Sequence, residues 1–287
     1  MPRKFRPNVL TWTEVDAHDP PPWTDRAFHT WNILAEGDSW FTMGGMPTSN
    51  LLFQMRFPRS TRIVNCAMPG DTIKHMSQIS NNPGLLRGLS EQSGEHWDLI
   101  LLSGGGNDLI DEAEAILIDP EVRGSEKMDS PAAYCDAQRL ETLIKKIKKG
   151  YRRIVELRDE PGAPSNGVSV VVHTYDYPTP NNSPARFAGI GLLGPWLFRA
   201  FTRDKIPEDD WVPLADYMFE QLAKGLLSLN GELENFHVVD TRGTLVRAEP
   251  GIRGESGDWL NEIHPNGEGY SKIARLIVEK AKSLIGK

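Results

Sequence analysis

The sequence has little cysteine, no long apolar run and no excess of positive charge. Only two of its 287 residues are cysteines, Cys66 and Cys135. Two cysteines in different elements give neither a disulfide framework nor the spacing of a metal-binding motif, so no metal and a reducing, cytoplasmic environment are expected. No uninterrupted apolar stretch approaches the roughly 18 residues that cross a bilayer, so no transmembrane segment is predicted.

The charge of the chain also excludes one class of partner. A net charge of −7 argues against a general nucleic-acid-binding protein, which needs a basic face to neutralise phosphates. The first residues are basic, but Asp16 and Asp19 follow where a signal peptide would have its apolar region. No signal peptide is therefore predicted, although a non-classical export route would leave no mark in the sequence.

Five apolar segments alternate with helical patterns along most of the chain. The predicted strands cover about residues 31–36, 61–67, 98–103, 168–175 and 236–240. The longest predicted helices cover about 130–158, 211–229 and 267–284, where apolar residues recur at three and four positions. Most of the strands are too apolar to have a solvated face. The sequence therefore predicts the α/β class, a three-layer α/β/α sandwich around a five-stranded parallel sheet.

Two segments lie outside this alternation. Residues 1–30 are rich in proline, acidic and aromatic residues and are expected to form an irregular N-terminal arm, leaving residues 31–287 as one domain. Residues 178–213 are too long for a plain connection and too apolar for a solvated one. They are either a helical elaboration that covers a sheet edge or a lid over the active site, and the two interpretations are compatible.

The first predicted strand ends in Gly37-Asp38-Ser39, a tight turn that carries a serine. In open parallel sheets the carboxyl ends of the strands are where ligands bind. The same tripeptide is also an ordinary helix start, with Asp38 or Ser39 as N-cap. Whether Ser39 is a nucleophile therefore depends on a histidine and on oxyanion donors elsewhere in the chain.

Three later loops supply such groups at the same edge of the predicted sheet. Gly70 follows the second strand, Asn107 follows the third, and His264 lies near the C-terminus. His264 can take the proton of Ser39 and return it to a leaving group. The N–H groups of Ser39 and Gly70 and the amide of Asn107 can converge on a tetrahedral oxyanion. Asp108 is expected to be the N-cap of the helix that follows.

These four blocks resemble those of the SGNH (GDSL-type) hydrolases, in the expected order and over about residues 31–284. The resemblance implies a flavodoxin-like three-layer fold and ester hydrolysis through an acyl-serine intermediate, without a metal or organic cofactor. It also implies that Ser39 is the nucleophile and His264 the general base and acid. Gly70 and Asn107, with the N–H of Ser39 itself, would form the oxyanion hole.

One position departs from the family pattern. The family usually has an aspartate three residues before the histidine, and this chain has Asn261 there. The oxygen of Asn261 can accept a hydrogen bond from the ring but carries no charge, and losing that charge is costly in a comparable triad. Asp258 is the preferred substitute because a loop can fold it back to the ring, whereas Glu262 is expected to point away. A Ser-His dyad with a backbone carbonyl is a further alternative.

The predicted substrate is a small-molecule ester, and the apolar segment 178–213 favours acyl or lipid-like esters. Trp40, Trp196 and Tyr175 are candidates for substrate contacts, and His173 is expected to be a hydrogen-bonded core residue near the floor of the site. A carbohydrate O-acetyl esterase on the same scaffold is one alternative. A non-catalytic SGNH-like protein that binds a ligand is another alternative, suggested by Asn261 in the place of the family's aspartate.

Overall fold

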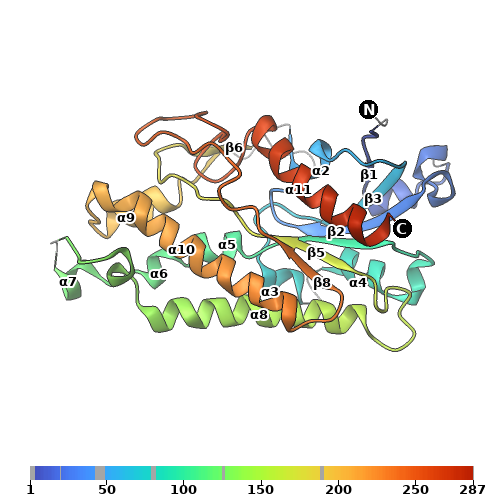
Figure 1. Ribbon diagram of the computed structural model, residues 1–287, viewed down its shortest axis with the longest axis horizontal. Helices are drawn as coiled ribbons and strands as arrows, with labels where there is room; N and C mark the ends of the chain where they lie inside the picture. The colour runs from blue at the N-terminus through green and yellow to red at the C-terminus, as the bar shows by residue number, and fades with distance from the viewer. Residues whose placement is uncertain are drawn as a thin grey trace.

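The computed structural model describes residues 4–19, 21–42, 49–78, 82–124, 127–187 and 191–286. Its centre is a six-stranded parallel sheet in the order β1-β3-β2-β4-β5-β8. The strands are β1 (Asn8–Leu10), β2 (Trp31–Gly37), β3 (Thr61–Asn65), β4 (Leu99–Ser103), β5 (Val170–His173) and β8 (Phe236–Val239). Helices cover both faces of this sheet (Figure 1). The predicted three-layer α/β/α architecture is confirmed.

The two helical layers differ in size. One layer contains α2 (Leu51–Gln54) and α11 (Gly267–Ile285), which pack against each other. The other contains α3 (Ile73–Met76), α4 (Pro83–Leu89) and the long helix α8 (Ala137–Arg158), with α10 (Glu208–Ser228) packed along α8. The shorter helices are α1 (Trp12–Val15), α5 (Gly106–Asp111), α6 (Ala113–Ile116), α7 (Pro120–Arg123) and α9 (Leu197–Arg203). No helix among the described residues is long and apolar enough to span a membrane.

The strands of the sheet centre are buried on both faces. Leu99, Ile100, Leu101 and Leu102 of β4 are each at most 1% exposed. Burial of a leucine or isoleucine side chain stabilises the fold by about 1.5–3 kcal/mol. This requirement for apolar side chains on both faces is why these strands read as continuous apolar runs in the sequence.

The N-terminal arm is more regular than predicted. Asn8–Leu10 pairs in parallel with β3, with Asn8 opposite Arg62 and Leu10 opposite Val64. The sheet therefore has six strands, and the prediction of five is corrected. A three-residue edge strand has a partner on one side only and needs no apolar run, so its sequence does not reveal it.

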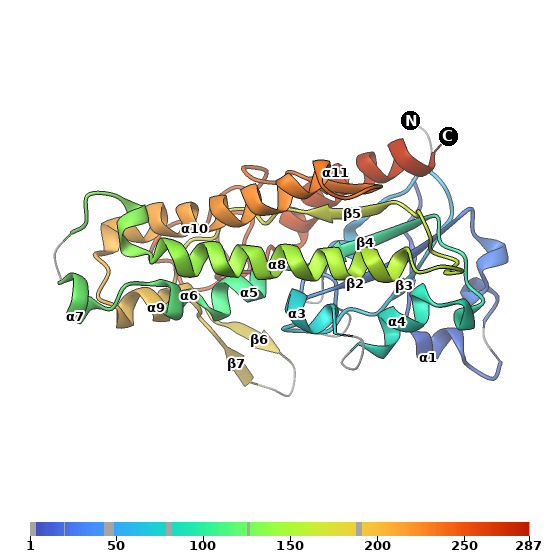
Figure 2. The same ribbon diagram turned by 90° about the horizontal axis from the view of Figure 1, so that it is seen from below.

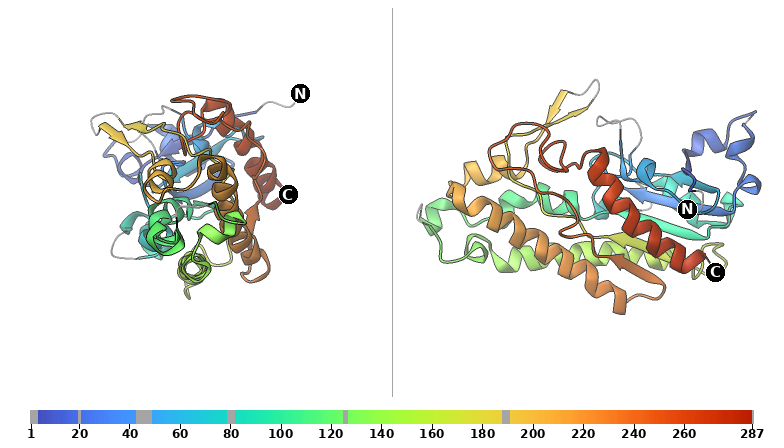
Figure 3. Two further views of the ribbon diagram at one scale, coloured as in Figure 1. Left: turned by 90° about the vertical axis from the view of Figure 1, so that its left-hand side faces the viewer. Right: turned by 45° about the horizontal axis from the view of Figure 1, so that its top comes forward.

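The described parts of residues 178–213 contain a hairpin, the helix α9 and the start of α10. The strands β6 (Ala185–Phe187) and β7 (Gly191–Leu193) pair antiparallel, and the hairpin projects from the body of the protein (Figures 2 and 3). Helix α9 follows and packs against α6, with Phe201 fully buried. The expected helical elaboration is thus present. A lid over the site stays a prediction, because Pro178 is the one described residue of this segment that lines the cavity beside Ser39.

The strand order locates the site. Strands β2 and β4 are neighbours in the sheet, but the chain continues from β2 to β3 on one side and from β4 to β5 on the other. Such a switch point opens a crevice at the carboxyl ends of the strands, where ligands bind in folds of this type. Ser39 follows β2 and Asn107 follows β4, so both candidate residues lie at this crevice.

Candidate active site

Ser39 and His264 lie within hydrogen-bond distance of each other. Ser39 Oγ is 2.8 Å from His264 Nε2, although the two residues are 225 positions apart in the chain. His264 is 2% exposed, and this burial lowers the pKa of its imidazole to about 4 because the charged form is disfavoured away from water. At neutral pH the ring is therefore neutral and can accept a proton.

The other nitrogen of the ring faces Asn261. His264 Nδ1 is 3.0 Å from Asn261 Oδ1, and the backbone N–H groups of Ile263 and His264 donate to the same oxygen at 3.1 and 3.0 Å. Backbone N–H groups only donate, so they fix the amide with its oxygen toward the ring. His264 Nδ1 then carries the proton, and Nε2 is the nitrogen that accepts from Ser39.

The prediction that Asp258 orients His264 is wrong. The Asp258 carboxylate binds Lys272 Nζ at 2.8 and 2.6 Å and accepts the N–H of Val246 at 2.6 Å. It is 4% exposed and joins its own loop to α11 and to the loop that contains Val246. Its charge is paired with Lys272, and the position beside Nδ1 belongs to the neutral oxygen of Asn261.

Glu262 points away from the imidazole, as predicted. Its carboxylate accepts the N–H of Trp196 and, at 2.7 Å, that of Phe198, at the start of α9. The ring of Trp196 in turn lies edge-on to the ring of His264, with 6.3 Å between the centroids. Glu262 therefore fixes the start of α9 beside the loop that carries His264. This contact between distant segments had no signal in the sequence.

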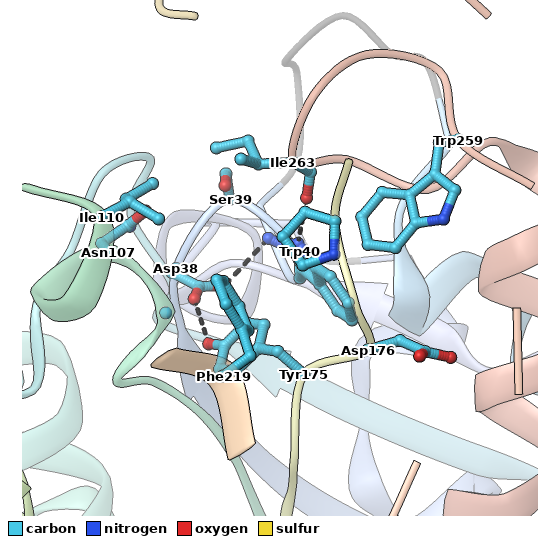
Figure 4. A pocket seen from close by; sticks show the side chains of 12 residues that line it. Asp38, Ser39, Trp40, Asn107, Ile110, Tyr175, Asp176, Phe219, Trp259 and Ile263 are labelled. Atoms are coloured by element: carbon cyan, nitrogen blue, oxygen red, sulfur yellow. Dashed lines mark hydrogen bonds between the residues drawn. The ribbon is translucent and has the colours of Figure 1, made fainter. Parts of the chain in front are cut away.

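Asn107 lines the same cavity as Ser39 (Figure 4). Its Nδ2 donates to the carbonyl oxygen of Asp71 at 2.9 Å, which orients the amide and leaves its second N–H for a ligand. Among the described residues, the backbone N–H groups of Ser39 and Gly70 have no hydrogen-bond acceptor. Such unpaired donors are what an oxyanion hole requires. Gly70 does not line the cavity, so its part in the oxyanion hole stays a prediction.

Asp108 caps a different helix from the one predicted. Its Oδ2 accepts the N–H of Ile73 at 2.8 Å, at the start of α3, whereas the N-cap of α5 is Gly105 with φ of 101°. Asp108 lies in the first turn of α5 and faces the loop that precedes α3. It therefore joins the loop of Gly70 to the loop of Asn107.

Two glycines are required by the close approach of neighbouring groups. A Cβ on Gly37 would lie 2.8 Å from Ser103 Cβ and 2.9 Å from the Ser103 carbonyl oxygen. A Cβ on Gly106 would lie 2.8 Å from the ring of Tyr175. Both contacts are closer than van der Waals packing allows. Gly37 lets the ends of β2 and β4 approach each other, and Gly106 lets the start of α5 pack against Tyr175.

The three predicted substrate contacts fall in two groups. Trp40 and Tyr175 line the cavity, and Trp196 does not. Trp40 is 3% exposed, and its Nε1 donates to the carbonyl oxygen of Ile263 at 3.1 Å, which joins the turn of Ser39 to the loop of His264. The indole also stacks on the ring of His173, with 5.4 Å between centroids and 13° between planes.

A buried polar network lies under this turn, and His173 is the one member that the sequence predicted as a hydrogen-bonded core residue. His173 is 1% exposed, as expected for a core residue. Its Nε2 is 3.0 Å from Ser103 Oγ, which is 3.0 Å from Asp38 Oδ1. The hydroxyl of Tyr175 donates to the other oxygen of Asp38, and burial raises the pKa of the Asp38 carboxyl above its ordinary value while it lowers the pKa of the His173 imidazole. Ser103 was missed because a serine that ends a strand has no distinctive spacing.

A cavity of about 20 Å³ opens beside Ser39 and Asn107 (Figure 4). Its walls are mostly aromatic and aliphatic, with Trp40, Ile110, Tyr175, Pro178, Phe219, Trp259 and Ile263. A volume of this size has room for about one water molecule or a group of similar bulk. In the part of the chain that the structure describes, no cluster of three or more potential metal ligands occurs.

The parallel α/β fold, the paired serine and histidine, and the asparagine beside them define the class of the protein. It is an ester hydrolase of the SGNH (GDSL) type. Residues 35–272 match the GDSL-like lipase/acylhydrolase family. The match covers most of the chain, so the chain belongs to this family. The resemblance found in the sequence is thereby confirmed.

Similar solved structures are distant in sequence. An extracellular lipase from Streptomyces rimosus has a TM-score of 0.50 at 15% identity, covering 89% of this chain and 100% of that one. A carbohydrate acetylesterase family member from Sinorhizobium meliloti has a TM-score of 0.49 at 16% identity, covering 90% and 100%. An aryl esterase from M. smegmatis has a TM-score of 0.44 at 15% identity, covering 89% and 100%. These likenesses concern the fold alone. A search of curated proteins finds no match.

Proposed function

We propose that this chain hydrolyses carboxylic esters with a short acyl group, with Ser39 as the nucleophile. The observation that carries the proposal is the 2.8 Å contact between Ser39 Oγ and His264 Nε2. The oxygen of Asn261, 3.0 Å from the opposite ring nitrogen, supports it because it selects the tautomer that can accept a proton. This pairing argues against the non-catalytic alternative, in which nothing requires the two groups to meet.

The reaction follows from these positions. Ser39 Oγ attacks the ester carbonyl while His264 Nε2 takes the hydroxyl proton. The N–H groups of Ser39 and Gly70 and the side chain of Asn107 stabilise the tetrahedral oxyanion. The C–O bond to the alcohol breaks, and His264 gives the proton to the departing oxygen. Water then attacks the acyl-serine with His264 again as base, releasing the acid and free Ser39.

The size of the cavity supports a short acyl group. About 20 Å³ beside Ser39 and Asn107 suits a small acyl group such as the methyl of an acetyl group. This favours acetyl and similar esters over the lipid-like esters that the apolar segment 178–213 favours. An acetylated carbohydrate is the second candidate substrate, since the same cavity accepts its acetyl group and leaves the alcohol outside.

The test compares wild type with Ser39→Ala on p-nitrophenyl acetate, butyrate and octanoate. We expect wild-type activity to fall from acetate to octanoate, and the variant to lose at least about 1,000-fold in kcat. Ser283→Ala, on the exposed surface of α11, is the control and should keep full activity. Full activity in Ser39→Ala, or labelling of another residue by a fluorophosphonate, would show that Ser39 is not the nucleophile.

A second variant tests the cavity itself. Ile110 is 6% exposed and lines the cavity, so Ile110→Ala should raise the octanoate-to-acetate ratio of kcat/KM about tenfold or more. Ile277→Ala on α11 removes a similarly buried side chain (2% exposed) that does not line this cavity, and its ratio should stay that of wild type. An unchanged ratio in Ile110→Ala means that the acyl group binds elsewhere.

A further inference from the structure

A chain of buried polar groups lies beneath the turn that carries Ser39. It runs from the carbonyl oxygen of Thr174 to His173 Nδ1 (2.8 Å), and from His173 Nε2 through Ser103 Oγ (3.0 Å) to Asp38 Oδ1 (3.0 Å). The three side chains are at most 1% exposed. None of them reacts with the substrate in the proposed mechanism, so their arrangement needs another explanation.

The protons in this chain can be counted because one end is fixed. A carbonyl oxygen only accepts, so the hydrogen bond to Thr174 requires a proton on His173 Nδ1. The two remaining hydrogen bonds, His173 to Ser103 and Ser103 to Asp38, need one proton each, and the hydroxyl of Ser103 supplies one. The other must sit on His173 Nε2 or on the Asp38 carboxyl. Without it, two lone pairs would face each other across 3.0 Å in one of the two contacts.

The neighbouring hydrogen-bond donors do not supply the missing proton. The hydroxyl of Tyr175 donates to Asp38 Oδ2, and the N–H of Trp40 donates to Oδ1 at 3.0 Å. Tyr175 OH also lies 3.3 Å from Ser103 Oγ. A donation from Tyr175 to Ser103 would still leave the bonds from Ser103 to His173 and Asp38 one proton short.

The ionisable groups around Asp38 bring no positive charge to replace that proton. Glu36 on β2 and Asp108 on α5 are buried carboxyls. The charge of Asp108 raises the pKa of Asp38, and the charge of Asp38 raises the pKa of Glu36. Tyr151 on α8 and Tyr270 on α11 are buried phenols, and their pKa values lie well above the ordinary one because of burial. An ionised Asp38 with a neutral His173 would thus be a buried charge among acids, which is unfavourable.

We propose that Asp38, Ser103 and His173 together hold one shared proton at neutral pH, and that this proton fixes the turn of Ser39. Asp38 directly precedes Ser39, and its Oδ1 holds the N–H of the residue that follows it, Trp40. Loss of the proton would set lone pair against lone pair and displace Asp38 or His173. The displacement would reach Ser39 through the backbone. The three side chains are positioning residues for the nucleophile.

The first test is nuclear magnetic resonance on the full chain with labelled histidine and aspartate, titrated from about pH 5 to 9. Through-bond correlations to the backbone assign His173 and Asp38. At pH 7 we expect either both ring nitrogens of His173 to be protonated or the Asp38 carboxyl to be protonated. A neutral His173 together with an ionised Asp38 at pH 7 overturns the proposal. This result is independent of whether the protein hydrolyses any ester.

The second test is kinetic and rests on the proposed function. Ser103→Ala removes the middle of the chain, so the shared proton should be lost at pH 7. We expect kcat on p-nitrophenyl acetate to fall about tenfold through misplacement of Ser39, with KM little changed. The alkaline fall of wild-type kcat, whose midpoint should equal that of the resonance titration, should also disappear in Ser103→Ala.

Tyr151→Phe is the matched control for Ser103→Ala. It removes a buried hydroxyl near Asp38 that donates to the carbonyl oxygen of Gly104 at 2.8 Å, outside the chain. It should retain the shared proton and the alkaline fall. A Ser103→Ala protein that keeps both, or a control that loses both, contradicts the proposal. Should Ser103→Ala fail to fold, the wild-type protein decides, because different kinetic and resonance midpoints would refute the link to Ser39.

Discussion

Replacing Asn261 with aspartate is the most direct test of how the histidine works. Asn261 Oδ1 accepts hydrogen bonds from His264 Nδ1 at 3.0 Å and from two backbone N–H groups. An aspartate oxygen can keep all three bonds and adds a negative charge beside the ring. We therefore expect Asn261→Asp to preserve the geometry and to raise the pKa of His264 above its wild-type value of about 4.

The size of the effect follows from the distance. Two unit charges about 4 Å apart attract each other by about 4 kcal/mol at an effective dielectric constant of about 20. The cost of burying the new carboxylate offsets part of this attraction. The two backbone N–H groups that donate to it reduce that cost. A net rise of about 1–3 pKa units is typical for such a neighbour, which is about 1.4–4 kcal/mol. Since the imidazolium forms in the transition state, kcat near pH 8 should rise about tenfold or more.

The assay is the pH dependence of kcat/KM on p-nitrophenyl acetate. The base must be neutral, so activity appears as pH rises through the pKa of His264. The wild-type rise should lie near pH 4, and that of Asn261→Asp should lie at higher pH. The two profiles then cross, with the variant slower at about pH 5 and faster at about pH 8. If kcat/KM of Asn261→Asp rises at the same pH as that of wild type, the reasoning is refuted.

Asn261→Leu is the control, because it keeps the branched shape of the side chain and removes the acceptor. The ring can then adopt the other tautomer, and we expect kcat to fall about 100- to 10,000-fold, as when a triad loses its correct tautomer. If Asn261→Leu retains wild-type activity, another group orients His264, and the predicted effect of Asn261→Asp loses its basis.

Two further changes test the remaining site residues. Asp258→Asn should lower the free energy of unfolding by about 1–3 kcal/mol, measured by chemical denaturation, because it weakens the pairing with Lys272. It should leave unchanged the pH at which kcat/KM rises, and a shift of that pH would return Asp258 to the catalytic site. Asn107→Ala should lower kcat about 100- to 1,000-fold with little change in KM; steady-state kinetics measure this, and an unchanged kcat would remove Asn107 from the oxyanion hole.

The parts of the fold that could be predicted from the sequence are those with a local physical cause. Strand β4 must be apolar on both faces because helices cover both, and the prediction of 98–103 agrees with Leu99–Ser103. The loops of Ser39 and Asn107 could be located because each directly follows such a strand. Strand β1 could not be predicted, since its three residues gain their structure from pairing with β3 rather than from their own pattern.

The parts of the site that could not be predicted depend on where loops fold in space. Asp258 and Asn261 are three residues apart, and nothing in their spacing says which one faces His264. The structure turns Asp258 toward Lys272 on α11 and Asn261 toward the ring. Ser103 and His173 end neighbouring strands, so their contact depends on the register of the sheet. The preference for Asp258 assumed a loop that folds this carboxylate back to the ring, whereas the loop turns it toward Lys272.

The neutral partner of His264 follows from how the nearby acids are already used. Asp38 holds the turn of Ser39, Asp258 pairs with Lys272, and Glu262 holds the start of α9. Each of these three carboxylates shapes one of the segments that meet at the site. Burial raises the pKa values of Asp38 and Glu262 above their ordinary values, so a further carboxylate at position 261 would add charge to a region already unfavourable to it.

The asparagine thus orients the ring without adding charge and leaves His264 neutral down to about pH 4. The arrangement gives up electrostatic stabilisation of the imidazolium at neutral pH, and in exchange the base remains active under acid conditions.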